Sequence, residues 1–267
     1  MWSTIMTIVI ALILSSVAAL SGPTTIIIHR QQQEALATQE DTSEPVSNSA
    51  ACGQVVEGLV ELNSDLNCSG DGLIVGADGT TIRLNRHTIT GPGPDSSKVG
   101  LSVGNQAGVM IKGPGTIEQF QAGILASGAE GTVISGINLR DNQIAVFSTG
   151  TEGLQAMQND LSRNSIGMGS QSSNGLQLTE NLMTGNVLAG ISFVTTDDSL
   201  ITKNDIRESH NGIYVDSGSN TNRIESNDVV ENELDLNNAN GLPINVNSNS
   251  FSDNNCETSN PSGLCTS

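Results

Sequence analysis

The chain has 267 residues, of which 36% are hydrophobic, and its formal net charge is −18 at pH 7. Residues 51–267 hold 9 Lys or Arg against 24 Asp or Glu, so the negative charge belongs to the body of the chain. Because proteins bind nucleic acids by neutralising phosphates with Lys and Arg, this balance excludes nucleic acid from the expected partners and disfavours anionic polymers and lipids.

Residues 1–22 have the pattern of an export signal. An apolar stretch runs over Ile5–Leu14, and the first charged side chain is Arg30. Val17 and Ala19 are small residues at the spacing of a cleavage site, but no Lys or Arg precedes the apolar stretch. An uncleaved membrane anchor is the alternative, because about 20 apolar residues span a bilayer. Both alternatives place the domain outside the cell, secreted or anchored at the outer face of the cytoplasmic membrane.

Residues 23–50 are expected to be a disordered polar tether. From Gln31 to Ala50 the chain is rich in Gln, Glu, Ser and Thr and has almost no large apolar residue. Such a composition cannot bury enough surface to fold. The folded domain is therefore predicted over residues 51–267, with the membrane involved only through the N-terminal segment.

A short sequence repeat organises this domain, with a step of about 22 residues from one copy to the next. A Gly-apolar-x-apolar tetrad, or a variant of it, recurs seven times. Alternation within each tetrad points side chains inward, which predicts one short strand per repeat lying parallel to its copy in the next. The tetrads begin at Gly100, Gly123, Ala145, Gly167, Gly190, Gly212 and Asp235.

Two further apolar columns support this register and predict two more strands per coil. One column comprises Ile117, Leu139, Leu161, Met183, Ile206, Val229 and Phe251, and the other Ile134, Ala156, Leu178, Ile201, Ile224 and Val246. No long run has the periodicity of a helix. The sequence therefore predicts an all-β fold, a right-handed single-stranded parallel β-helix of about seven to eight coils. The step from Gly72 to Gly100 is longer than the others, which predicts an inserted loop over Gly91–Lys98.

Asparagines recur with the same period and predict stacked amide ladders. An inward Asn at each bend can bond to the Asn above and below and to turn backbone. Isolated Asx-turns are the alternative. One ladder comprises Asn159, Asn181, Asn204, Asn227 and Asn249, and the other Asn142, Asn164, Asn186, Asn232 and Asn254, interrupted at Ser209.

Four cysteines fit an oxidising compartment and a domain fastened at both ends. With coils about 4.8 Å apart, Cys52 and Cys68 lie far beyond disulfide reach of Cys256 and Cys265. We therefore expect the pairs Cys52–Cys68 and Cys256–Cys265, one bridge at each end. Four reduced thiols are the alternative.

The segment Asp78–Gly91 resembles the opening coil of secreted β-helix repeat proteins in the pectin-lyase-like group, although Arg86 stands where that motif usually has Gly. This group includes carbohydrate-processing proteins and periplasmic accessory proteins that mature copper sites. The resemblance implies the fold for roughly residues 52–256 and is weak evidence for function.

Five outward residues are the candidates for catalysis. Asp197, Asp198 and His210 loosely resemble the site of polygalacturonases, but the Asn-Thr-Asp triplet, a Gly before the His and the Arg-x-Lys motif are missing. Lys203 and Arg207 are candidates for the base and cation of a lyase or epimerase. The alternatives are solvent-facing turn acids for the Asp pair and surface salt bridges for the two cations.

The sequence identifies no cofactor. His87 and His210 lie more than five coils apart and cannot share an ion, so a weak Ca²⁺ site at Asp197, Asp198 and Asp216 is the one metal expectation. Tyr214 is expected to face solvent as an isolated surface residue, and a thin sugar platform is the alternative.

These observations favour a non-catalytic extracellular scaffold or binding module and lean against an enzyme. Its expected partner is an extracellular polysaccharide or a surface protein, and the oligomeric state stays open. The alternatives are a polysaccharide lyase, glycoside hydrolase or epimerase with a divergent site, and an accessory factor for metal-site maturation. The scarcity of catalytic groups is the observation that supports the first.

Overall fold

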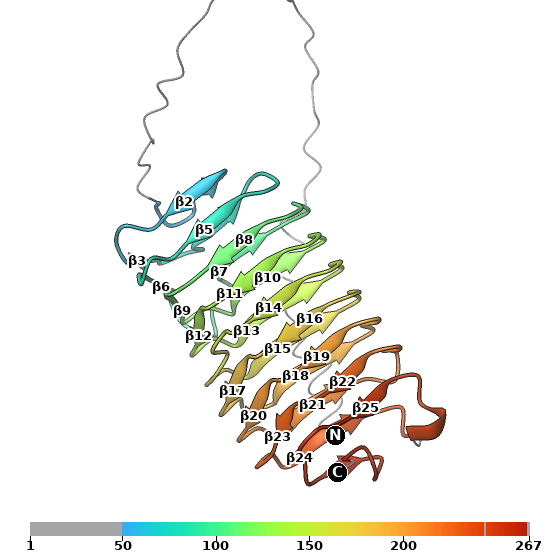
Figure 1. Cartoon of the computed structure of the whole chain (residues 1–267). Coiled ribbons are helices and arrows are strands. Elements are labelled where there is room, and N and C mark those ends of the chain that lie inside the picture. The colour runs from blue at the N-terminus through green and yellow to red at the C-terminus, as the bar shows by residue number, and fades with distance from the viewer. Residues whose placement is uncertain (1–49, 243, 266–267) are drawn as a thin grey trace, which may run out of the picture. The chain divides into compact units, whose positions relative to one another are not determined.

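Short parallel strands stack coil on coil along the domain (Figure 1). The computed structural model describes residues 50–242 and 244–265. The predicted signal or anchor and the predicted tether lie outside this range, apart from residue 50. Within the described part of the chain, no helix is long and apolar enough to cross a bilayer. The only helical element there is the 3₁₀ turn η1 (Ile244–Val246).

The coils contribute strands to three sides of the fold, and every strand pair is parallel. The first side is a ten-stranded sheet, which comprises β1 (Val55–Val56), β4 (Leu73–Val75), β7 (Val99–Val103), β10 (Ala122–Ser127), β13 (Ile144–Thr149), β15 (Ile166–Gln171), β18 (Ala189–Val194), β21 (Asn211–Val215), β24 (Leu234–Asn238) and β26 (Ser259–Asn260).

The second side is a nine-stranded sheet, which comprises β2 (Leu59–Glu61), β5 (Thr81–Arg83), β8 (Met110–Lys112), β11 (Val133–Ser135), β14 (Gln155–Met157), β16 (Gln177–Thr179), β19 (Leu200–Thr202), β22 (Arg223–Glu225) and β25 (Ser250–Ser252).

The third side is built from two smaller sheets joined by bridges through Asp160. One comprises β3 (Leu66–Asn67), β6 (Thr88–Thr90), β9 (Thr116–Glu118) and β12 (Asn138–Arg140), and the other β17 (Leu182–Thr184), β20 (Asp205–Arg207) and β23 (Asp228–Val229).

The register confirms the parallel β-helix. Ile124 pairs with Val146, Val146 with Met168 and Met168 with Ile191, so successive tetrads lie on one another. These side chains belong to the buried core cluster inside the coil. The fold has about nine coils, more than the seven to eight predicted, because strands before the first tetrad also pair. The right hand of the coil stays a prediction.

Tetrad glycines mark positions where adjacent coils approach too closely for a side chain. A Cβ on Gly100 would lie 2.5 Å from the carbonyl oxygen of Gly123, and one on Gly123 would lie 2.7 Å from the carbonyl oxygen of Ala145. Both distances are shorter than a carbon atom tolerates. The glycine column therefore reflects the close contact between coils.

The inserted loop predicted over Gly91–Lys98 is confirmed. Leu73 of β4 pairs with Leu101 of β7, which reproduces the long step from Gly72 to Gly100, and the extra chain lies between β6 and β7. A second insertion was not predicted. It lies between β24 and β25 and contains η1, so that Ile224 pairs with Phe251, further along the chain than one regular repeat.

This second insertion makes the predicted columns wrong in the last coil. Phe251 belongs with Ile224 and not with Val229, whereas Val246 lies in η1 and is 60% exposed. The columns break here because the chain forms a local loop, in which the side chain of Asn247 donates a hydrogen bond to the carbonyl of Leu242. A fixed period cannot follow such an insertion.

The asparagine ladders are confirmed through the regular coils. Asn204 accepts hydrogen bonds from the backbone N–H and the side-chain amide of Asn181, both at 3.0 Å, and donates to Asn227 at 2.9 Å. The same second insertion shifts both ladders, because Asn254 and not Asn249 lies on Asn227. Asn249 instead lies on Asn222, in a ladder that was not predicted.

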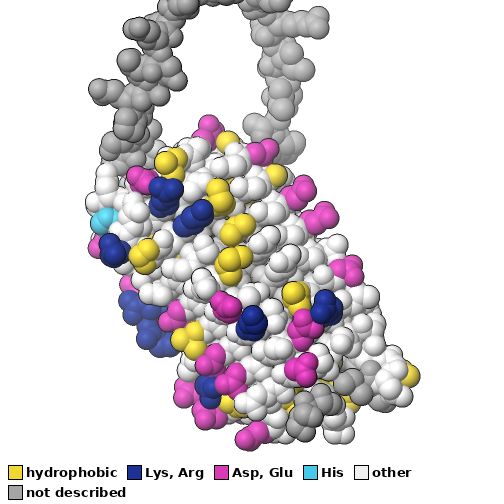
Figure 2. All heavy atoms as spheres, in the orientation of Figure 1, with side chains coloured by type: hydrophobic (Ala, Val, Ile, Leu, Met, Phe, Trp, Pro, Cys, Tyr) yellow, Lys and Arg dark blue, Asp and Glu magenta, His cyan; other side chains and the backbone are white. Residues whose placement is uncertain are grey.

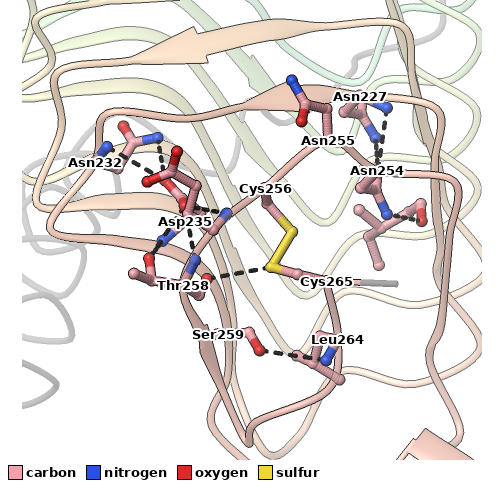
Figure 3. The surroundings of a disulfide bond; sticks show 12 residues. Asn227, Asn232, Asp235, Asn254, Asn255, Cys256, Thr258, Ser259, Leu264 and Cys265 are labelled. Carbon is pink, nitrogen blue, oxygen red and sulfur yellow. Dashed lines mark hydrogen bonds between the residues drawn. A yellow bond between two sulfur atoms is a disulfide. The ribbon is translucent and has the colours of Figure 1, made fainter. Parts of the chain in front are cut away.

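Both predicted disulfides are present. Cys52–Cys68 lies in the first coil, and Cys256–Cys265 closes the last (Figure 3). Beside the second bridge, the carboxylate of Asp235 is buried and accepts hydrogen bonds from Asn232 and from the backbone and hydroxyl of Thr258. Covalent and polar contacts therefore hold the end of the array.

The prediction of an exposed Tyr214 is wrong. Its side chain is only 6% exposed, and Leu125 and Phe147 at the same register position are also buried. Phe147 lies against Gly169 of the next strand, where an added Cβ would be 3.2 Å from its ring. Alternation fixes the direction of a side chain but not its access to solvent, because side chains on neighbouring strands cover one another.

Candidate functional site

The adjacent acids Asp197 and Asp198 lie in the turn between β18 and β19 and hold the next turn in place. Asp197 accepts the backbone N–H of Asn220 at 2.6 Å, and Asp198 accepts the hydroxyl of Thr221 at 2.5 Å. Both partners lie one coil further along the chain. This arrangement agrees with the turn-acid alternative for the pair.

The third acid of the predicted Ca²⁺ site also organises a turn. Asp216 accepts hydrogen bonds from the N–H groups of Thr195 and Gly218 and from the hydroxyl of Ser219. Across the described ranges, no group of three or more His, Cys, Asp or Glu side chains is arranged to hold a metal ion. The predicted weak Ca²⁺ site finds no support there.

The two candidate cations, Lys203 and Arg207, lie outside the turn that contains Asp197 and Asp198. Lys203 is exposed in the turn between β19 and β20. The Nε of Arg207 lies 2.6 Å from a carboxylate oxygen of Asp205, and its guanidinium also contacts Asp228. The hydrogen bond to Asp205 is the main cause of a raised pKa at Arg207. Arg207 thus forms the surface salt bridges that were the alternative to a catalytic role.

His210 lies in a third turn, directly before β21. Its Nδ1 is 2.6 Å from a carboxylate oxygen of Glu233. The five candidates therefore occupy three different turns and one strand of the coil. A glycosidase needs two carboxyl groups that face each other across a bound sugar. The structure does not bring these residues together in that way.

The other described histidine is paired on the first coils. The Nδ1 of His87 lies 3.2 Å from a carboxylate oxygen of Asp65. The pKa of the Asp65 carboxyl is lowered, chiefly by a hydrogen bond from the backbone N–H of Thr88 and then by the one to His87.

A polar groove of about 380 Å³ lies elsewhere, where the third side of the coil turns into the ten-stranded sheet. Its lining includes Gln119, Asp141 and Arg163 from equivalent turn positions on three successive coils, and Gln143 and Ser165 directly before β13 and β15. Gly185 and the exposed Val187 continue the lining on the next coil. Pro94 and Asp95 of the inserted loop line it as well.

Sequence reasoning missed this groove. The signal that could have located it was the long step from Gly72 to Gly100, because insertions in a repeat array often border a binding face. None of the five catalytic candidates lines it.

The class of protein that the fold defines is a disulfide-bonded parallel β-helix, whose described residues do not gather the five catalytic candidates into one site. The family model described as periplasmic copper-binding protein (NosD) matches residues 64–264. The chain belongs to this family. The family's periplasmic location agrees with the export predicted from the sequence. No curated protein matches the chain.

The copper named in the family description does not fit the donors in the described part of the chain. Copper sites in proteins use Cys thiolates, Met thioethers and His imidazoles. All four cysteines are in disulfides. His87 and His210 are each paired with a carboxylate, several coils apart. The described methionines are also dispersed: Met168 and Met183 are core residues, and Met110 and Met157 lie on strands two coils apart.

Proposed function

We propose that this chain is a non-catalytic binding scaffold of the exported compartment, which recognises an extracellular glycan or a protein through its rigid surface. The observation that carries this proposal is the separation of Asp197, Asp198, Lys203, Arg207 and His210 around the coil. The hydrogen bonds and ion pairs of four of them serve turns and neighbouring coils.

On the face in Figure 2, acidic, basic and hydrophobic side chains lie interspersed among the other side chains and the backbone. Stacked coils with a common register form a long, regular surface, and solenoid proteins use such surfaces for binding.

The experiment that tests this proposal is an activity assay on the exported protein with polygalacturonate, alginate and neutral glucans. We expect no release of reducing ends or unsaturated products. Turnover that disappears in the Asp198→Ala variant would overturn the scaffold and establish a divergent polysaccharide-active enzyme.

A second candidate function is an accessory role in the maturation of a copper site, which the family match favours. Because the described donors do not form a copper site, the protein would act in this role by holding a protein partner. Titration with Cu(I) against a competing chelator tests this version. We expect no tight stoichiometric binding, and one tightly bound equivalent lost in the His87→Ala or His210→Ala variant would show that the chain itself carries the metal.

A further inference from the structure

We propose that the polar groove is a binding site for an uncharged oligosaccharide that lies along the axis of the coil. This inference rests on the proposed scaffold function and names a site and a ligand class for it. Nothing in the family description assigns this groove. Four features carry the inference: its construction from successive coils, its unused hydrogen-bonding groups, its charge and its inserted wall.

The groove crosses equivalent positions on successive coils. Gln119, Asp141 and Arg163 follow one another at the regular spacing of the repeat, and the N–H of Asp141 donates to the carbonyl of Arg163 at 3.0 Å. Gln143 and Ser165 are likewise neighbours, because Ile144 and Ile166 pair directly after them. Neighbouring coils are about 4.8 Å apart, which is close to the length of one hexose in an extended glycan. Successive sugars can therefore meet equivalent side chains.

Polar side chains of the groove have hydrogen-bonding capacity to spare. Within residues 50–242 and 244–265, the side chains of Gln119, Gln143 and Ser165 take part in no hydrogen bond, although each is partly buried. An amide has two donor hydrogens and an acceptor oxygen, and a hydroxyl can both donate and accept a hydrogen bond. Such groups match the hydroxyls of a sugar, each of which is also a donor and an acceptor.

The charged groups favour a neutral ligand. The lining has the acids Asp95 and Asp141 and the single base Arg163, whose guanidinium lies 3.3 Å from the Asp141 carboxylate. One more acid than base repels a uronate or a phosphate, as does the net charge of the chain. The exposed Asp141–Arg163 pair costs little to rearrange, so both groups remain able to form charge-assisted hydrogen bonds with hydroxyls.

The inserted loop gives the groove its wall. Pro94 and Asp95 belong to the extra residues between β6 and β7, which the regular coils lack. The backbone of Gln119, Asp141 and Arg163 has positive φ values of 63°, 56° and 58°. The three residues therefore share one left-handed backbone conformation, and their side chains leave the coil from equivalent backbone positions along the groove.

Calorimetric titration of the exported protein tests the site. The probes are uncharged tetrasaccharides of glucose, mannose, galactose and xylose, with tetragalacturonate as the charged comparison. The groove variant is Gln119→Ala/Gln143→Ala. The matched control is Gln177→Ala, which removes the same amide from an exposed position on the nine-stranded sheet. Circular dichroism establishes that all variants are folded.

We expect at least one uncharged tetrasaccharide to saturate the protein and to bind more tightly than its disaccharide, because the groove crosses four successive coils. The groove variant should bind it about tenfold more weakly, as expected for the loss of two ordinary hydrogen bonds, and Gln177→Ala should bind it unchanged.

Three results would overturn the inference: no saturation by any uncharged tetrasaccharide at millimolar concentration, equal affinity in the groove variant, or tighter binding of tetragalacturonate. The scaffold proposal has a separate test, since it fails only if the protein turns over a polysaccharide. A glycan that binds equally to the groove variant would leave the scaffold standing and remove the groove.

Discussion

Replacing Asn204 with alanine should remove the centre of the amide ladder. The Asn204 side chain is 1% exposed and takes part in five hydrogen bonds. Its oxygen accepts the backbone N–H and the side-chain amide of Asn181, and its amide donates to the carbonyls of Leu178 and Thr202 and to Asn227.

The expected cost follows from these contacts. An ordinary hydrogen bond contributes about 1 kcal/mol net, and a buried donor left without a partner costs about 1–3 kcal/mol. In Asn204→Ala the backbone N–H of Asn181 loses the Asn204 oxygen as its acceptor, and several other bonds are lost with it. We therefore expect the free energy of unfolding to fall by about 2–4 kcal/mol.

Denaturant unfolding followed by far-ultraviolet circular dichroism measures this change, and hydrogen exchange of the Asn181 amide locates it. Asn138→Ala is the matched control, because Asn138 is exposed on β12, and its cost should stay within about 0.5 kcal/mol. Equal unfolding midpoints for the two variants, with Asn181 still protected in Asn204→Ala, would refute the ladder as a source of stability.

Three further predictions concern the coil contacts, the C-terminal bridge and pH. Gly100→Ala should lower the free energy of unfolding by about 1–3 kcal/mol through overpacking. Gly70→Ala is the control and should leave stability unchanged, because the space around its Cβ is open. Thermal unfolding of the two variants measures the difference. Removing the Cys256–Cys265 bridge should lower the free energy of unfolding by about 3 kcal/mol and speed amide hydrogen exchange more at β26 than in the middle coils. Equally faster exchange in all coils would contradict this. Because the Asp65 carboxyl has a lowered pKa, it stabilises the fold above its ordinary value of about 3.9, and this contribution is lost as pH falls through the folded pKa. The stability difference between wild type and Asp65→Asn should therefore disappear in acid, and a difference that grows below pH ~3 would be incompatible with the lowered pKa.

Periodicity predicted the fold because each coil must return the same side chains to the core. The register of Ile124, Val146 and Met168 follows directly from the tetrads, and the disulfide pairs follow from the distance between the two ends. Prediction failed where the period changes. The η1 insertion placed Phe251 and Asn254 at positions around the coil that differ from the expected columns.

The candidate site was harder to predict, because a sequence period identifies neighbours between coils but not the contacts around one coil. Asp198 and His210 are close in sequence but lie in different turns, each with its own partner on the next coil. The groove depends on the inserted loop, whose length the sequence shows but whose path it does not. Tyr214 shows the same limit, since its direction follows from alternation and its burial does not.

Hydrogen–deuterium exchange of the exported protein, with and without a saturating uncharged tetrasaccharide, tests the central claim most directly. The account predicts slower exchange at the inserted loop, at 119–121, at 141–143 and at 163–165, with the oligosaccharide recovered intact. Protection confined to the turns that contain Asp197 and His210, or cleavage of the oligosaccharide, would contradict a binding scaffold that recognises its ligand in the groove.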